Sequence, residues 1–323
     1  MQGLGRRQWT KNTSILYHCR MNEPIRKYFR PGIIAFMSYP SIIRGEGDIE
    51  GAIRKIAVDP YFDVIEISWI KDPDVRARVK KTLDQSRLSV VYGAQPRLLT
   101  TGMNINHLED AQNAAALETL KQGIDEAYEM GASGFAFLSG NYDEANKEKA
   151  YEILVKNTCQ LCEYAAARGE MAVNLEVFDF DIDKKSLVGP APLALRFAQD
   201  MRKLHKNFGL LVDLSHVPLL HETIRESILP VKDYIAHVHI GNAVCGDPSH
   251  PAYGDAHPRF GFPNGSNDVE ELTEFLRVLL EIGYLNTEKP PIVSFEVKPF
   301  GDEDPDIIIA NGKRTLETAW ARV

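Results

Sequence analysis

Four ionisable side chains stand near the C-terminal ends of short β-rich segments in the second half of the chain. They are Glu176 in MAVNLEVFDF, Asp213 in LLVDLSH, His239 in IAHVHIGN and Glu296 in PIVSFEVKP. A carboxylate that points inward from an apolar strand needs a partner. Three carboxylates at one point repel and raise one another's pKa unless a cation lies between them. We therefore predict that the four side chains bind one metal ion.

The donor types indicate which kind of ion. Three carboxylates and one imidazole form a hard, oxygen-rich set that suits Mn²⁺, Mg²⁺ or Co²⁺, and manganese is the ion we expect. A structural zinc site would instead use thiolates. His237 stands two residues before His239 on the same strand face, so we expect it one layer deeper, in the core or hydrogen-bonded to a ligating carboxylate.

Alternating β-rich and helical segments must position these groups. Strands are expected in GIIAFMSYP, DVIEISWI, SVVYGAQP, GFAFLSG, MAVNLEVF, GLLVDLSH, IAHVHIGN and PIVSFEVKP, and helices over 48–60, 72–86, 107–131, 143–168, 192–208, 217–229, 269–280 and 304–322. About eight such repeats imply a parallel sheet closed into a (β/α)₈ TIM barrel. The barrel brings the C-terminal ends of its strands to one rim, where its active sites lie. No GxGxxG follows the first strand, which disfavours an open dinucleotide-binding sheet.

The chain of 323 residues suits one barrel domain over residues 31–323, preceded by an N-terminal arm over 1–30. The arm is expected to lie over the barrel or a neighbouring subunit, or else to be a partly ordered tail. A long rim loop, 241–267, is rich in Gly, Pro and His. A loop of this length predicts a lid or a substrate wall, with or without a partner subunit.

Charge and hydropathy narrow the class of protein. The formal net charge of −8 gives no footprint for a nucleic-acid backbone. No apolar run is long enough for a membrane span, and the N-terminus lacks a signal-peptide core, so a cytoplasmic protein is expected. Cys159 and Cys162 form a CxxC inside a helical pattern rather than at a helix N-terminus, which favours two small apolar side chains over a redox pair.

The motifs NLEVF, VDLSH, HVHIGN and SFEVKP, in this order, resemble the xylose isomerase-like TIM-barrel superfamily of sugar isomerases and keto-sugar epimerases. The resemblance covers most of the chain after about residue 31. It implies that Glu176, Asp213, His239 and Glu296 hold one divalent cation and that His216 contacts substrate oxygens. It also implies that Glu176 and Glu296 act as the catalytic pair that moves a proton from opposite faces of the substrate carbon.

The chain also departs from the epimerase pattern. The epimerases carry a further glutamate six residues after the first ligand and an arginine six residues after the ligand histidine, whereas this chain has Ile182 and Cys245. Both of these substrate contacts are missing, and the nearest replacements are Asp181, Asp183 and Arg259. We therefore expect conserved metal chemistry on a different substrate, with Arg259 as a substrate-binding residue.

This departure, the GDAHPRFG segment and the N-terminal arm resemble the α subunit of bacterial C-glycoside deglycosidases, which act on 3-oxo-glucosides with a small β subunit. The resemblance implies removal of the C2 proton next to a C3 ketone, followed by elimination of the aglycone from C1. His107 is a candidate catalytic base or acid, because the leaving ring carbon needs a proton. An exposed polar residue near a helix N-terminus is the equal alternative for His107.

Three more residues are candidate substrate contacts. Glu66 is expected either to orient a ligand or substrate or to form a buried ion pair with Lys298, and Lys298 points to the same face as Glu296. Trp69 is expected in an aromatic pocket wall or packed in the core. The expected partners are a sugar or glycoside, with a β subunit and contacts between copies of the chain as further possibilities.

Three alternatives remain open. The first is a keto-sugar isomerase or 3-epimerase that acts without a β subunit. The second is a DNA repair enzyme like endonuclease IV, which needs several more His and acidic ligands, whereas the second and third strand ends offer Trp69 and Gln95. The third is a catalytically inactive barrel that serves as a binding scaffold, which would bind no divalent ion.

Overall fold

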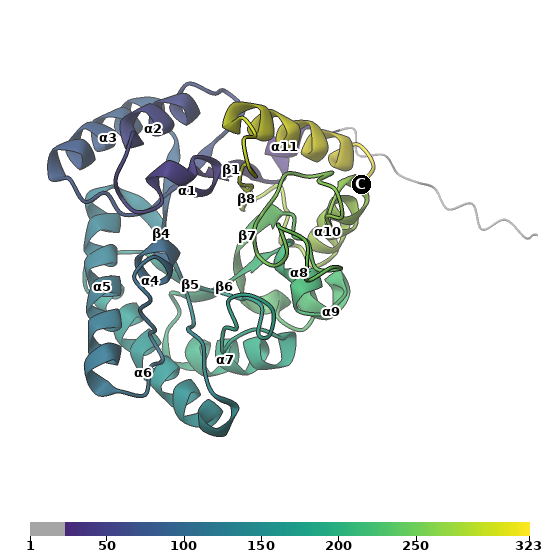
Figure 1. Ribbon diagram of the computed structural model, residues 1–323. Helices are drawn as coiled ribbons and strands as arrows, with labels where there is room; N and C mark the ends of the chain where they lie inside the picture. The colour runs from purple at the N-terminus through teal and green to yellow at the C-terminus, as the bar shows by residue number, and fades with distance from the viewer. Residues whose placement is uncertain (1–22) are drawn as a thin grey trace, which may run out of the picture.

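The computed structural model describes residues 23–323, and within them the sheet is a closed barrel. Every strand pairs in parallel with its sequence neighbours, and the last strand pairs with the first. Figure 1 shows the strands as an inner ring surrounded by helices. The strands are β1 (Arg30–Ile34), β2 (Val64–Ile67), β3 (Ser89–Gly93), β4 (Ala132–Leu138), β5 (Ala172–Glu176), β6 (Phe208–Asp213), β7 (Ile235–Gly241) and β8 (Ile292–Glu296). The predicted (β/α)₈ TIM barrel is confirmed.

Seven longer helices form the outer layer of the described part of the chain. They are α2 (Ile49–Ala57), α3 (Pro73–Ser86), α5 (Asp110–Glu129), α6 (Lys147–Ala166), α7 (Ala191–Leu204), α10 (Val269–Glu281) and α11 (Pro305–Trp320). Shorter helical segments are α1 (Ala35–Ser38), α4 (Gln95–Leu99), α8 (His216–Leu219), α9 (Ile224–Ile228), and the 3₁₀ turns η1 (Ile25–Lys27), η2 (Pro40–Ile42), η3 (Glu144–Asn146) and η4 (Lys232–Tyr234).

Local sequence signals explain where the outer helices begin and which face they bury. Asp48 caps α2 by accepting a hydrogen bond from the backbone N–H of Gly51, and the apolar residues of this helix recur at helical spacing. Asp268 and Glu271 form a capping box at the start of α10. The resulting apolar stripes pack against the outside of the barrel and, with the barrel interior, make one continuous core.

The prediction of one helix over 217–229 is wrong, because two short helices, α8 and α9, form there. His221 between them has a left-handed backbone with φ of 59°, which ends helical geometry. Thr223 then starts α9 with a capping box that includes Glu226. The other long helices form within a few residues of their expected limits.

Gly312 lies in the middle of α11 where a larger residue would crowd the barrel. A Cβ at this position would lie 3.2 Å from ring carbons of Phe295 on β8. The glycine therefore brings the last helix close to the last strand, despite its low helix propensity.

The expected arm over 1–30 falls mostly on residues 1–22, which lie outside the described residues. Residues 23–30 pack against the barrel. Phe29 is buried and lies edge-on to Trp320 of α11, with ring centroids 5.5 Å apart, and the Trp320 indole N–H donates to the carbonyl of Glu23. No helix within residues 23–323 is long and apolar enough to cross a membrane.

Cys159 and Cys162 lie in the middle of α6, and both are free thiols. Burial raises the pKa of both thiols above the usual value. A raised thiol pKa disfavours the thiolate that redox chemistry needs.

Candidate metal centre

The four side chains singled out in the sequence meet at the C-terminal ends of β5, β6, β7 and β8. One donor atom each from Glu176, Asp213, His239 and Glu296 lies within 4.8 Å of the other three, and all four residues are buried. The strands deliver these groups because each of the residues stands at or near the last position of its strand. The described structure therefore contains one compact group of three carboxylates and one imidazole.

The contacts inside this group fit a bound cation. His239 Nδ1 lies 2.7 Å from Glu296 Oε2 and 3.5 Å from Glu176 Oε1. Glu176 Oε1 is buried and has no hydrogen-bond partner among residues 23–323. An unpaired buried carboxylate oxygen is costly, and a cation among these oxygens would remove that cost. The hard donors match the Mn²⁺, Mg²⁺ or Co²⁺ class.

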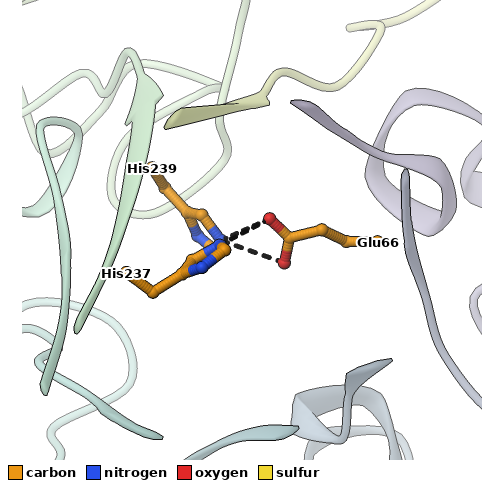
Figure 2. Close-up of side chains that lie close together, drawn as sticks. All are labelled: Glu66, His237 and His239. Carbon is orange, nitrogen blue, oxygen red and sulfur yellow. Dashed lines mark hydrogen bonds and ion pairs between the residues drawn. The ribbon is translucent and has the colours of Figure 1, made fainter. Parts of the chain in front are cut away.

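The Glu66 carboxylate on β2 points toward the imidazole rings of His237 and His239, as Figure 2 shows. Its carboxylate oxygens each lie 3.2 Å from His239 Nε2, and His237 Nε2 lies 2.7 Å from Glu66 Oε1. The sequence analysis allowed His237 to contact a ligating carboxylate, but the structure pairs it with Glu66. The alternative ion pair between Glu66 and Lys298 is not among the contacts of the described residues.

The charges around Glu66 and His239 shift the pKa values of these two residues in opposite directions. Burial alone raises the pKa of Glu66, but His237 and His239 outweigh it and hold this pKa well below the usual range. Burial lowers the pKa of His239, yet Glu66, Glu176 and Glu296 raise it well above 6.5. In the metal-free protein the imidazole therefore carries part of the positive charge that the carboxylates require.

Glu296 has a raised pKa for a different reason. Burial is the largest cause and, with the nearby Glu176, it raises the Glu296 pKa to about 7, while His257 and His239 oppose the rise. A carboxyl group that titrates near neutrality can both accept and return a proton at working pH.

Two of the remaining carboxylates are fixed by hydrogen bonds from neighbouring loops. The Gln95 side-chain amide donates to Glu176 Oε2 over 2.7 Å. Asp213 accepts from the backbone N–H and the hydroxyl of Ser215, over 2.8 and 2.5 Å. Gln95 occupies the third strand end, where the DNA repair alternative requires a histidine.

His216 is buried beside the metal group and begins α8. Its Nδ1–H donates to the carbonyl of Val177 over 2.7 Å, and its ring packs on Phe178 with centroids 4.3 Å apart. His216 Nε2 lies 3.8 Å from Asp213 Oδ2 and 3.1 Å from Asp255 Oδ1. These contacts fix the ring orientation and leave Nε2 directed toward the site.

The long loop between β7 and α10 contributes two residues that the sequence analysis did not select. Asp255 and His257 are both buried, and His257 Nε2 lies 2.8 Å from Asp255 Oδ1 and 3.5 Å from Glu296 Oε1. His257 has a positive φ of 50°, and its carbonyl accepts the backbone N–H of Lys298 over 2.7 Å. The available signal was an Asp and a His two residues apart in GDAHPRFG. The loop thus forms a wall of the site.

A cavity of about 140 Å³ opens beside the metal group. The strand-end residues Glu66, Glu176, His239 and Glu296 line it with Lys298. The rest of its wall comes from the end of β1, the short helices α1 and α4, and loops. The lining residues are Ile34, Phe36, Met37, Ile43, Glu66, Gln95, Pro96, Leu99, Glu176, Phe178, Lys184, His239, Asp255, His257, Glu296 and Lys298.

Three predicted site residues lie elsewhere. Trp69 lines a separate surface pocket, and its indole N–H donates to the carbonyl of Ile43. His107 lines a polar cleft between the loops after β3 and β4. Arg259 forms an ion pair with Glu303 at 2.9 Å. Arg259 is held by Glu303, which does not line the cavity, and the Trp69 side chain lies in the separate pocket. The loop after β3 carries His107 into the other cleft.

The two acidic replacements considered for the missing substrate contacts also lie outside the cavity lining. Asp181 pairs with His221 at the surface, with Nε2 and Oδ2 3.0 Å apart. Asp183 pairs with Lys184, which lines the cavity, over 2.8 Å.

The sequence matches a family model, and the fold matches several solved structures. A family model described as xylose isomerase-like TIM barrel matches residues 57–311. A search of curated proteins finds no significant match.

Three solved structures illustrate the likeness. D-psicose 3-epimerase from Clostridium cellulolyticum H10, solved with D-tagatose, is 18% identical with a TM-score of 0.62, and the match covers 91% of this chain and 96% of that chain. L-ribulose 3-epimerase is 21% identical with a TM-score of 0.67, and the match covers 90% of this chain and 95% of that chain. The 3-keto-D-glucoside 4-epimerase from E. coli is 16% identical with a TM-score of 0.59, and the match covers 91% of this chain and 99% of that chain. Likeness at these identities shows a shared fold.

Proposed function

Because the chain belongs to the xylose isomerase-like TIM-barrel family, we propose that it is a divalent-metal-dependent enzyme acting on a keto-sugar. The observation that carries this proposal is the buried group of Glu176, Asp213, His239 and Glu296, whose donor atoms lie within 4.8 Å of one another. These four residues would hold the ion, and Mn²⁺ is the ion we expect. When bound, such an ion polarises a carbonyl and acidifies the adjacent C–H.

Glu176 and Glu296 are the residues that we propose move the proton. They stand on β5 and β8, which are not neighbours in the barrel, so their carboxylates approach a substrate from different strands. In the metal-free protein, burial and the nearby Glu176 raise the Glu296 pKa to about 7, so this carboxyl group binds a proton more readily than an exposed one. His216 Nε2, directed toward the site, is a proposed contact for a substrate oxygen.

Epimerisation or isomerisation of a keto-sugar is the reaction that we favour. Removal of a proton next to the ketone and its return on the other face inverts that carbon, and the two glutamates provide both steps. The related structures named above are sugar 3- and 4-epimerases by their descriptions. Lys298 and Glu66 line the same cavity and complete the proposed substrate and positioning contacts.

Carbon–carbon bond cleavage of a 3-oxo-C-glucoside is the second candidate. It is favoured by the apolar part of the cavity wall, which includes Phe36, Met37 and Leu99 and would suit an aromatic aglycone. Removal of the C2 proton would then form a C1=C2 double bond as the bond from C1 to the aglycone breaks, and the leaving ring carbon takes up a proton. A small β subunit belongs to this candidate. His107 lines another cleft and is given no role in this cavity.

Solvent exchange tests the shared chemistry. The protein is incubated with Mn²⁺ in D₂O with ketohexoses and, separately, with a 3-oxo-C-glucoside, and NMR follows loss of the C–H next to the ketone. We expect metal-dependent exchange with at least one substrate. Products inverted at the exchanged carbon would identify an epimerase. Release of the aglycone would identify the carbon–carbon cleavage reaction. Absence of exchange from every substrate, with the ion shown to be bound, would overturn the proposal.

The Glu296→Gln variant tests the assigned base. We expect an unchanged fold and a rate lower by about 10²- to 10⁴-fold, which is the usual loss when a general base is removed. Glu288→Gln is a matched surface control, since Glu288 is exposed. Rates are compared at saturating Mn²⁺ with the bound metal measured, and wild-type turnover by the variant would remove Glu296 from the mechanism.

A further inference from the structure

A second polar group lies in the cavity beside the proposed metal ligands. Lys184 comes from the loop after β5 and Asp255 from the loop after β7, and both line the cavity. Lys184 Nζ lies 3.0 Å from Asp255 Oδ2 and 2.8 Å from Asp183 Oδ2. Neither Lys184 nor Asp255 contacts the four proposed ligands directly through these bonds, so the group needs its own explanation.

The backbone around Lys184 is held in one conformation. Asp179 is fully buried, and its carboxylate accepts four backbone hydrogen bonds, from the N–H groups of Ile182, Asp183, Lys184 and Lys185. The two loops also approach closely at Gly254, which has a φ of 93°, and a Cβ there would lie 3.1 Å from the Cβ of Asp183. The backbone N–H of Asp255 donates to Asp183 Oδ2 over 3.2 Å. The ammonium is therefore presented to the cavity by a fixed scaffold.

Lys184 keeps unused hydrogen-bonding capacity. It has three N–H donors and directs two of them to Asp183 and Asp255. Asp255 Oδ1 is buried and faces His257 Nε2 at 2.8 Å and His216 Nε2 at 3.1 Å. One ammonium N–H is thus left at the cavity wall, where an unpaired donor is costly.

We propose that Lys184 and Asp255 form a hydroxyl-binding subsite for a neutral sugar. A sugar hydroxyl can accept the free ammonium N–H of Lys184, while Asp183 and Asp255 hold the ammonium in place. The inference rests on the proposed function in placing a sugar in this cavity, and it adds the part of the sugar's chemistry that the wall recognises.

The first experiment measures sugar binding by calorimetry on the full chain loaded with Mn²⁺. A panel of ketohexoses and 3-oxo-glucosides is tested, and the member that binds most tightly is then titrated into Lys184→Met. We expect the dissociation constant to rise roughly tenfold or more, because a hydrogen bond to a charged group is lost. Lys185→Met is the matched control, since Lys185 is the next residue and is exposed, and its affinity should equal that of the wild type.

The outcomes separate this inference from the proposed function. Equal affinity of Lys184→Met and wild type overturns the subsite and leaves the proposed function standing. Weaker binding by Lys184→Met without turnover by the wild type supports the subsite and overturns the function. Absence of binding by every panel member overturns both.

A second variant guards the result against a folding defect. Lys184→Gln keeps an N–H donor, so its affinity should lie between those of the wild type and Lys184→Met if both variants keep wild-type metal content and melting temperature. If Lys184→Met does not fold, a wild-type affinity in Lys184→Gln overturns the subsite.

Discussion

At the scale of single residues, His239 is held from both sides. The Glu66 carboxylate accepts a hydrogen bond from His239 Nε2, and the carboxylates of Glu296 and Glu176 face His239 Nδ1. When Nε2 carries its proton toward Glu66, the lone pair of Nδ1 is free for a cation, so the outer carboxylate selects the tautomer that a metal ligand needs. Through this contact, Glu66 would act on the proposed metal centre as a positioning group.

We expect Glu66→Gln to weaken Mn²⁺ binding by about 10- to 100-fold, the usual effect of removing the partner of a ligating histidine. The affinity is measured by competition with a chelator, and Glu288→Gln serves as the surface control. Unchanged affinity in Glu66→Gln would mean that His239 needs no carboxylate to orient it.

The same residues give the metal-free protein a defined pH dependence. Burial lowers the pKa of His257, but Asp255 and Glu296 raise it to about 9, above the value near 6.5 of an unfolded chain. The stabilisation from the protonated imidazole is therefore complete below about pH 6.5 and is lost as the pH rises toward 9. Glu296, with its raised pKa of about 7, acts in the same direction at lower pH, because the folded state favours its proton.

We accordingly expect the melting temperature of the metal-free protein to fall between about pH 5 and pH 9. Bound Mn²⁺ replaces the positive charge of the protons, so the fall should be smaller in the loaded protein. Thermal denaturation with and without chelator over this range provides the measurement. A flat or rising profile for the metal-free protein would contradict these charge assignments.

At the scale of elements, the strands supply the proposed ligands, while the short helices α1 and α4 and the loops supply most of the rest of the cavity wall. The segment after β5 is organised by Asp179, a buried carboxylate that satisfies four backbone N–H groups in place of regular secondary structure. The loop after β7 is organised by an internal bond from the Asn242 side-chain amide to the carbonyl of Arg259 and by a bond from the Asn267 side-chain amide to the carbonyl of Leu214, outside the loop. Both loops are therefore fixed parts of the wall.

Asp179→Ala should loosen the loop after β5 more than the barrel. We expect faster amide exchange in residues 180–188 and a loss of about 2–3 kcal/mol of stability, since removal of the carboxylate leaves buried N–H groups unpaired. Asp181→Ala is the matched control because Asp181 is exposed and pairs only with His221 at the surface in the described structure. Hydrogen exchange read by mass spectrometry and denaturant unfolding provide the two values, and equal exchange in both variants would refute the role of Asp179.

At the scale of the whole molecule, the metal centre joins four strands that are distant in sequence. A cation bound only by the folded state stabilises it by about 2.7 kcal/mol at a free concentration 100 times its dissociation constant. We therefore expect Mn²⁺ to raise the melting temperature of the wild type and to have much less effect on Asp213→Asn, which loses one proposed ligand. An equal rise in both proteins would place the ion elsewhere.

The barrel could be predicted from sequence because its signals are local and repeated. Each β-rich run and each amphipathic helix is encoded within about twenty residues, and their alternation leaves few topologies. The helix expected over 217–229 failed where a single left-handed residue, His221, and a new cap at Thr223 divided the pattern. Such a break depends on backbone geometry that periodicity does not report.

The sequence by itself determined the closed barrel and which four strand ends meet, because parallel strands carry their last residues to one rim whatever the loops do. Only the tertiary structure decided which other residues join them. Asp255 and His257 reach the centre, while Trp69, His107 and Arg259 do not line its cavity. Loop side chains are directed by contacts between segments distant in sequence, and no local pattern encodes those contacts.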